Sequence, residues 1–250
     1  MKKLVSIFCA AALALSLAGC GAQAADTNTN TNTTAPVVST VYSLEDATVL
    51  TFTDSGITAQ DGGTGYEIDG TALTIDSAGT YAVTGTCADG SITIKKGTTG
   101  VTLVLNGLSL TSADTAPITC NKSTEVTIIA AEGSVNSLTD SARNNDDEYP
   151  DNEAAENAVI KCKDGSQVTL GGTGSLTITA NGKNGIKSGT TTAEEGEASL
   201  TICELTLTIN APVNDAVNAE QTLNVESGTL TIAAADDALH SDLVLNIGAE

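Results

Sequence analysis

The stretch Asn184-Gly185-Ile186-Lys187-Ser188 recurs in altered form at Asp215-Ala216-Val217-Asn218-Ala219 and at Asp237-Ala238-Leu239-His240-Ser241. The copies begin 31 and 22 residues apart, and each reads acidic or amide, small, aliphatic, polar, small. Two weaker copies precede them, at Asn157-Ala158-Val159-Ile160-Lys161-Cys162 and Thr115-Ala116-Pro117-Ile118-Thr119-Cys120. Self-similarity at this spacing is typical of a solenoid, in which successive turns of the chain stack on one another.

Short runs of alternating Thr and aliphatic residues follow the copies, for example Ser175-Leu176-Thr177-Ile178-Thr179 and Leu205-Thr206-Leu207-Thr208-Ile209. Such runs, bounded by Gly and Asn, are typical of strands with one buried face. We therefore predict an all-β chain, folded as a single-stranded right-handed parallel β-helix. A β-sandwich is the alternative, but the strands of a sandwich need not resemble one another.

The two ends of the predicted domain differ from its middle. Residues 42–90 repeat poorly, so we expect them to form an N-terminal cap region. The chain stops at Gly248-Ala249-Glu250, directly after a strand-like run and without a cap. We therefore expect the sequence to be truncated at its C-terminus, with further coils in the full protein.

The N-terminus has the features of an export signal. A basic start at Lys2 and Lys3 is followed by a short apolar run that closes at Leu17-Ala18-Gly19-Cys20. A run this short is typical of a cleaved signal rather than a membrane span. The final tetrad resembles the lipobox of bacterial lipoproteins, which makes residues 1–19 the signal peptide and Cys20 the lipidated residue. An ordinary cleaved signal is the alternative.

A polar, low-complexity segment follows the signal. Residues 20–41 are rich in Thr and Asn and lack an apolar period, so we expect a flexible tether. Residues 42–250 then form one domain, long enough to bury a sizeable core. With lipid on Cys20, the protein is expected to be anchored on the extracellular face of the cell membrane.

The chain is strongly acidic, with a formal net charge of −21. Removing residues 1–19 removes two lysines and no acid, which leaves −23. Nucleic acid is therefore excluded as a partner. Solubility is one reason for such acidity, and cation binding is the other.

Cys120 and Cys162 occupy the same position in two copies, where other copies have Ser188, Ala219 and Ser241. This pattern predicts a small inward position in successive coils. Neighbouring parallel strands lie about 4.8 Å apart, a spacing that permits a Cys120–Cys162 disulfide without requiring one.

Several motifs, taken in order, resemble one family of bacterial, mostly clostridial, carbohydrate-binding right-handed parallel β-helices. The motifs are Gly79-Thr80-Tyr81-Ala82-Val83-Thr84-Gly85, the run 101–105, the acidic insert 140–156, Gly171-Gly172-Thr173-Gly174-Ser175-Leu176, Asn184-Gly185-Ile186-Lys187-Ser188 and Asp236-Asp237-Ala238-Leu239-His240-Ser241. The resemblance covers residues 75–250 and implies polygalacturonate binding with calcium. Family copies usually read Asp-Gly-Ile, whereas Ala216 and Ala238 stand in place of Gly here.

The first set of candidate binding residues follows the inward aliphatic residue of each copy. Because side chains alternate along a strand, these next residues point outward and form one exposed column. The column consists of Lys161, Lys187, Asn218 and His240. Its rungs match roughly the length of one sugar residue, and its cations suit uronate carboxylates. The alternative is that the column has no ligand, because any β-helix must place polar residues on its exterior.

The second set is acidic and opens or closes the copies. It consists of Asn214, Asp215, Glu220, Asp236, Asp237 and Asp242. Hard oxygen ligands from adjacent coils suit Ca²⁺, which we predict as the cofactor. The alternative is that each Asp or Asn simply caps a turn.

The insert at 140–156 breaks the repeat and holds seven acids. We expect an extruded loop, either functional or merely solvated. Its Tyr149 is the aromatic residue that could stack on a sugar.

These residues predict a cell-surface protein that binds acidic plant polysaccharide (polygalacturonate or pectin) with calcium and is not an enzyme. Calcium shared with the sugar would remove the repulsion between two acidic partners. The first alternative is a pectate-lyase-like enzyme, although the single arginine, Arg143, lies in the insert rather than on a coil face. The second is a structural adhesin without a sugar ligand.

Overall fold

The computed structural model describes residues 40, 42–60 and 62–248, and within them every regular element is a β-strand. The strands are β1 (Thr48–Thr53), β2 (Gly56–Ala59), β3 (Tyr66–Asp69), β4 (Ala72–Ile75), β5 (Gly79–Cys87), β6 (Ser91–Ile94), β7 (Val101–Ser112), β8 (Ile118–Cys120), β9 (Glu125–Ala130), β10 (Val135–Asp140), β11 (Ala158–Cys162), β12 (Gln167–Gly171), β13 (Ser175–Thr179), β14 (Asn184–Ser188), β15 (Ser199–Ile202), β16 (Thr206–Ala211), β17 (Val217–Ala219), β18 (Thr222–Val225), β19 (Thr229–Ala234), β20 (Leu239–Ser241) and β21 (Val244–Ile247). The expected all-β class is confirmed.

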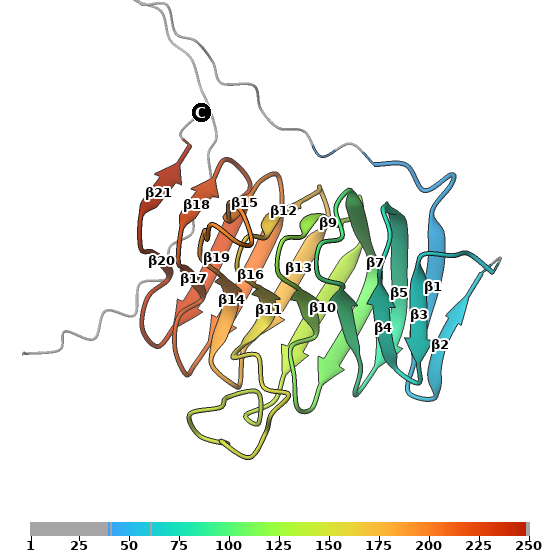
Figure 1. Cartoon of the computed structure of the whole chain (residues 1–250), viewed down its shortest axis with the longest axis horizontal. Helices are drawn as coiled ribbons and strands as arrows, with labels where there is room; N and C mark the ends of the chain where they lie inside the picture. Colours follow the sequence, from blue (N-terminus) through green and yellow to red (C-terminus); the bar gives the residue numbers. More distant parts are fainter. Residues whose placement is uncertain (1–39, 41, 61, 249–250) are drawn as a thin grey trace, which may run out of the picture.

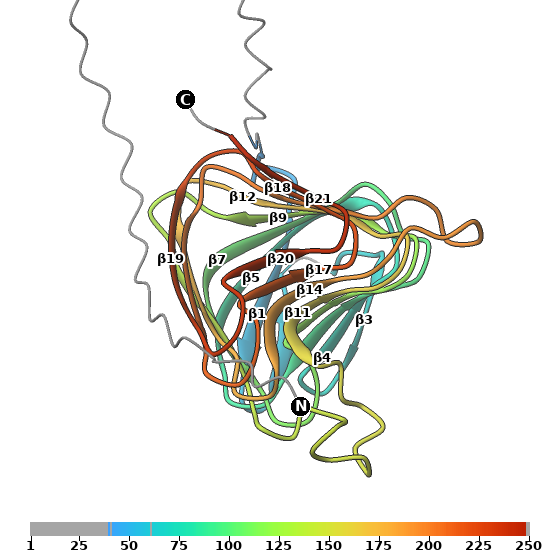
Figure 2. The ribbon, with the colours of Figure 1, turned by 90° about the vertical axis from the view of Figure 1, so that its left-hand side faces the viewer.

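From β10 onward, each strand pairs in parallel with the strand three places before it, whereas β8 and β9 pair with β6 and β7. The first column is β8-β11-β14-β17-β20, the second is β9-β12-β15-β18-β21, and the third is β10-β13-β16-β19. The long strand β7 joins the second and third columns, because Val101–Leu105 pair with β9 and Ser109–Ser112 pair with β10. The columns run along the long axis of the molecule and curl around one interior (Figures 1 and 2).

The predicted interior row is present in the first column. Ile160 pairs with Ile186, Ile186 with Val217, and Val217 with Leu239. The first three are buried, and Leu239 is half-buried in the last described coil. All four pack in or against one continuous apolar cluster, so copies far apart in sequence become vertical neighbours.

The Thr-rich runs form strands because alternation gives each one an apolar and a polar face. In β13, Leu176 and Ile178 are buried, whereas Thr177 between them is exposed. Leu207 and Ile209 of β16 lie beside them in register and are also buried. Aliphatic side chains fill the interior of these coils without aromatic residues.

The stacked cysteines lie in this interior. Cys162 pairs in register with Cys120 on one side and with Ser188 on the other. Both cysteines are fully buried free thiols, as the small inward position predicted. Hydrogen bonding with Cys162, together with burial, raises the pKa of Cys120 well above its usual value.

The acidic insert begins one residue later than the sequence pattern indicated. Asp140 is the last residue of β10 and is buried, so it belongs to the strand rather than to the exposed loop. We use the term insert for residues 141–157, which connect β10 to β11 and project from the stack (Figure 2). Asn144, Asn145 and Asn152 of the insert are buried, so part of it is a packed structure.

The stacking generates a stability prediction. Ile186 is fully buried in the middle of the interior row, so Ile186→Ala should lower the free energy of unfolding by about 2–5 kcal/mol. The exposed Thr177→Ala serves as the control and should change it by less than about 0.5 kcal/mol. Urea unfolding monitored by circular dichroism measures both. Equal, small effects of the two variants would contradict the interior row.

Candidate functional site

The predicted exposed column lies on the first column of strands. Lys161 of β11 pairs with Lys187 of β14, Lys187 with Asn218 of β17, and Asn218 with His240 of β20. All four side chains are partly exposed, whereas the residue before each is buried in the first three strands and half-buried at Leu239. We call these four residues the lysine column. Thr119 of β8 extends it by one rung.

The two lysines differ in their surroundings. Lys187 Nζ lies 3.1 Å from Glu220 Oε1 and is paired, whereas Lys161 forms no ion pair within the described residues. Burial, and then the charge of Lys187, lowers the pKa of Lys161 from the ordinary lysine value of 10.5. Lys161 is therefore a half-buried cation next to a second cation, and the charges of Glu156 and Glu220 offset only part of these two effects.

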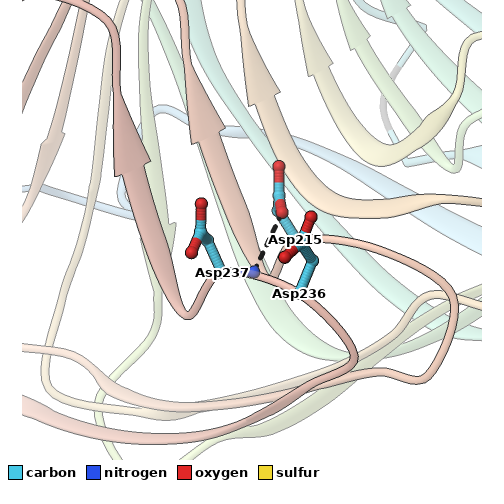
Figure 3. Close-up of side chains that lie close together, drawn as sticks. All are labelled: Asp215, Asp236 and Asp237. Atoms are coloured by element: carbon cyan, nitrogen blue, oxygen red, sulfur yellow. Dashed lines mark hydrogen bonds between the residues drawn. The ribbon is translucent and has the colours of Figure 1, made fainter. Parts of the chain in front are cut away.

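Three of the predicted metal ligands gather into one cluster beside the column. Carboxylate oxygens of Asp215, Asp236 and Asp237 all lie within 4.8 Å of one another. Asp215 precedes β17, and the other two precede β20, one coil further along (Figure 3). Asp215 is 5% exposed, whereas Asp236 and Asp237 are exposed. We call these three residues the aspartate cluster.

Hydrogen bonds hold Asp215 in place. Its Oδ1 accepts from the backbone N of Asp237 over 3.0 Å, and its Oδ2 accepts from Asn218 Nδ2 over 2.6 Å. Asn218 therefore connects the lysine column to the aspartate cluster. One of the three carboxylates is buried and two are open to solvent. Carboxylates are the hard oxygen ligands that Ca²⁺ prefers, and the open side leaves room for water or an external ligand.

The other three predicted ligands bond elsewhere. Asn214 Nδ2 donates to Asn184 Oδ1 over 2.8 Å, and Glu220 pairs with Lys187. Asp242 Oδ1 lies 2.8 Å from His240 Nε2. The structure therefore divides the predicted set of six into a cluster of three and three separate contacts.

His240 links the end of the column to the cluster. Its Nδ1 lies 3.3 Å from Asp237 Oδ2, and its Nε2 is bonded to Asp242. Hydrogen bonding with Asp242, and to a lesser extent with Asp237, raises the pKa of His240 against the opposing effect of its partial burial. The acids around His240 therefore favour its protonated form.

Tyr149 lies in the insert and is not part of the lysine column. Arg143 stacks over its ring, with Cζ 5.5 Å from the ring centroid. Cys20, the predicted lipid attachment site, lies outside the described residues. None of the described residues forms a helix of the length and apolar character needed to cross a membrane.

Comparison with known proteins identifies the family to which the chain belongs. The chain belongs to a family of carbohydrate-binding domain-containing proteins, whose sequence model matches residues 69–246. Among solved structures it is similar to a polysaccharide lyase-like protein from C. thermocellum, determined as a gadolinium derivative. The two share 24% sequence identity and a TM-score of 0.53, over 82% of this chain and 97% of the other. No curated protein matches the chain significantly.

The environment of Lys161 generates a pH prediction. Because its folded-state pKa is lowered, the protein loses stability whenever Lys161 is charged, that is, below the folded pKa. The loss disappears as the pH rises through the folded pKa toward 10.5. Lys161→Met should therefore be more stable than the wild type at pH 7, and the difference should shrink at pH 10.

Urea unfolding at the two pH values measures this difference. The exposed Lys95→Met is the matched control, because it removes the same charge from a solvated position. A Lys161→Met protein that is less stable than the wild type by the same amount at both pH values would contradict the assigned environment.

Proposed function

We propose that this protein is a right-handed parallel β-helix that binds an acidic plant polysaccharide, polygalacturonate, with calcium. Right-handed winding is supported by the three parallel columns, because parallel strand–crossover–strand connections are right-handed in about 98% of cases. Family membership supports carbohydrate as the ligand and favours binding over a spacer without a sugar ligand. The observation that carries the calcium and acidic-sugar proposal is the lysine column lying directly beside the aspartate cluster.

The spacing of the column suits a linear polysaccharide. Its rungs follow one another at about 4.8 Å, close to the length of one sugar residue. Lys161 lacks an ion-pair partner within the described residues, so its ammonium group is available to a uronate carboxylate. A sugar chain running along the column would meet Lys161, Lys187, Asn218 and His240 in turn.

Calcium resolves the conflict of charge. A protein with a formal charge of −21 repels a polyanion at long range, so two lysines alone do not explain binding. The aspartate cluster supplies up to three carboxylate ligands, which leaves coordination positions for carboxylates of the sugar. A shared ion would then bridge the two acidic partners.

The protein would act at the cell surface. The lipobox-like tetrad ending at Cys20 supports a lipid anchor, and residues 20–41 would hold the domain at a distance from the membrane. A tethered binding domain of this kind keeps the cell in contact with its polysaccharide.

Calcium removal tests the proposal. The wild type should be pulled down by insoluble polygalacturonate in millimolar calcium and should stay in solution in excess EDTA. Asp236→Asn should weaken calcium binding at least about tenfold in a calorimetric titration, because it removes one of three charged ligands. Asp236 is chosen because Asp215 also holds structural hydrogen bonds.

Glu125→Gln is the matched control, since it removes the same charge from an exposed position on β9. It should bind calcium and polygalacturonate like the wild type. Pull-down that is undiminished in EDTA, or equal calcium affinity of the two variants, would contradict calcium bridging.

A polysaccharide lyase is the second candidate. Its supporting observation is Lys161, whose lowered pKa favours the neutral amine that β-elimination needs as a base. Incubation with polygalacturonate and calcium, followed by ultraviolet absorbance of the unsaturated product, separates the two functions. Product formed by the wild type and absent from Lys161→Met would establish the enzyme, whereas binding without product supports the binding protein.

A further inference from the structure

Three side chains meet at the insert, and none of them belongs to the lysine column. Asp114 lies between β7 and β8, whereas Arg143 and Tyr149 belong to the insert. Arg143 Nε donates to Asp114 Oδ1 over 2.6 Å, and Arg143 Cζ lies 5.5 Å from the centroid of the Tyr149 ring. We call Asp114, Arg143 and Tyr149 the insert triad.

One buried residue, Asn152, fixes the backbone at all three positions. Its Nδ2 donates to the carbonyl of Asp114 over 2.6 Å and to that of Arg143 over 2.7 Å. Its backbone N donates to the carbonyl of Tyr149 over 2.9 Å. Asn152 is 8% exposed, so these bonds are largely shielded from water. The three side chains are therefore presented from one fixed frame.

Further buried polar groups attach the insert to the coils. Asn144 Nδ2 donates to Asp140 Oδ2 and to the carbonyl of Ala158, each over 2.9 Å. Asn145 Nδ2 donates to the carbonyl of Gly182 over 2.9 Å. The insert is thus anchored to two coils of the stack, and the insert triad is held rigidly relative to them.

Stability alone does not account for the insert triad. The side chains of Arg143 and Asp114 are 47% and 54% exposed, and exposed ion pairs contribute little to folding. When such groups are already held in place, less side-chain conformational entropy is lost as a ligand binds. Within the described residues, Asp114 Oδ2 and both Arg143 Nη atoms form no hydrogen bond. These two half-exposed side chains therefore keep an acceptor and donors that no described residue occupies.

We propose that the insert triad binds an uncharged sugar residue. Asp114 Oδ2 accepts from one hydroxyl, the Arg143 Nη groups donate to a neighbouring hydroxyl, and the Tyr149 ring packs against the apolar face of the sugar. An anion is disfavoured here, because Asp114 already neutralises Arg143, and Glu148 and Asp151 add negative charge nearby. This site is independent of calcium and shares no residue with the lysine column or the aspartate cluster.

A glycan array carrying neutral and uronate-containing oligosaccharides, probed in EDTA, tests the proposal. The wild type should bind at least one neutral oligosaccharide, which is then titrated by calorimetry. Arg143→Ala removes charged hydrogen bonds and Tyr149→Ala removes the stacking surface, so each should weaken that binding at least about tenfold. Tyr149→Phe keeps the ring and should bind nearly as well as the wild type.

Lys95→Ala is the matched control for the lost charge and should leave the neutral sugar bound as in the wild type. Calcium-dependent pull-down on polygalacturonate should be unchanged in Arg143→Ala, which separates this site from the proposed function. A wild type that binds no neutral oligosaccharide, or that binds one equally well after both alanine substitutions, would overturn the proposal.

Discussion

Parallel, in-register pairing of the first strand column is the constraint on which the rest of the structure depends. It places Ile160, Ile186, Val217 and Leu239 in one interior row, and the next residue of each strand in one exterior row. A shift of one residue would exchange the two rows, because side chains alternate across a strand. Burial of the aliphatic row therefore also fixes the exposed row, so the same burial that stabilises the domain orders the face that we propose for binding.

The charged groups on that face follow the order of the coils. Cations stand on the middle rungs, at Lys161 and Lys187, whereas carboxylates gather at the last two described coils, around Asp215 and Asp237. Asn218 belongs to both groups, since it stands in the lysine column and donates to Asp215. A ligand that spans several rungs would thus meet ammonium groups first and a set of hard oxygen ligands next. The insert adds a third, uncharged-sugar surface whose geometry is set by Asn152 rather than by the repeat.

The repeat made much of this arrangement predictable from the sequence. Equivalent positions of the copies become neighbours, so the lysine column and the contact between Asp215 and Asp237 follow from spacing alone. The ion-pair partners did not follow, because the repeat places Glu220 and Asp242 beside the column without fixing which side chain each one contacts. Only the folded structure shows that they contact Lys187 and His240. The insert was the least predictable part. It has no repeat to set its contacts. The number of acids in it gave no sign that Asp140 is buried and accepts hydrogen bonds from Asn144 and from the backbone N of Gly182.

The stacking itself is tested most directly by distances along one exterior row of the second column. Thr127, Thr169, Thr201, Asn224 and Asn246 pair successively in register, although they span much of the chain. Nitroxide labels on cysteines placed at Thr127 and, in turn, at Thr201, Asn224 and Asn246 can be measured by electron–electron dipolar coupling. The labels should lie two, three and four rungs apart, so the distance should grow by about 4.8 Å at each step. Distances that do not rise by a common increment would contradict the stacked-coil architecture.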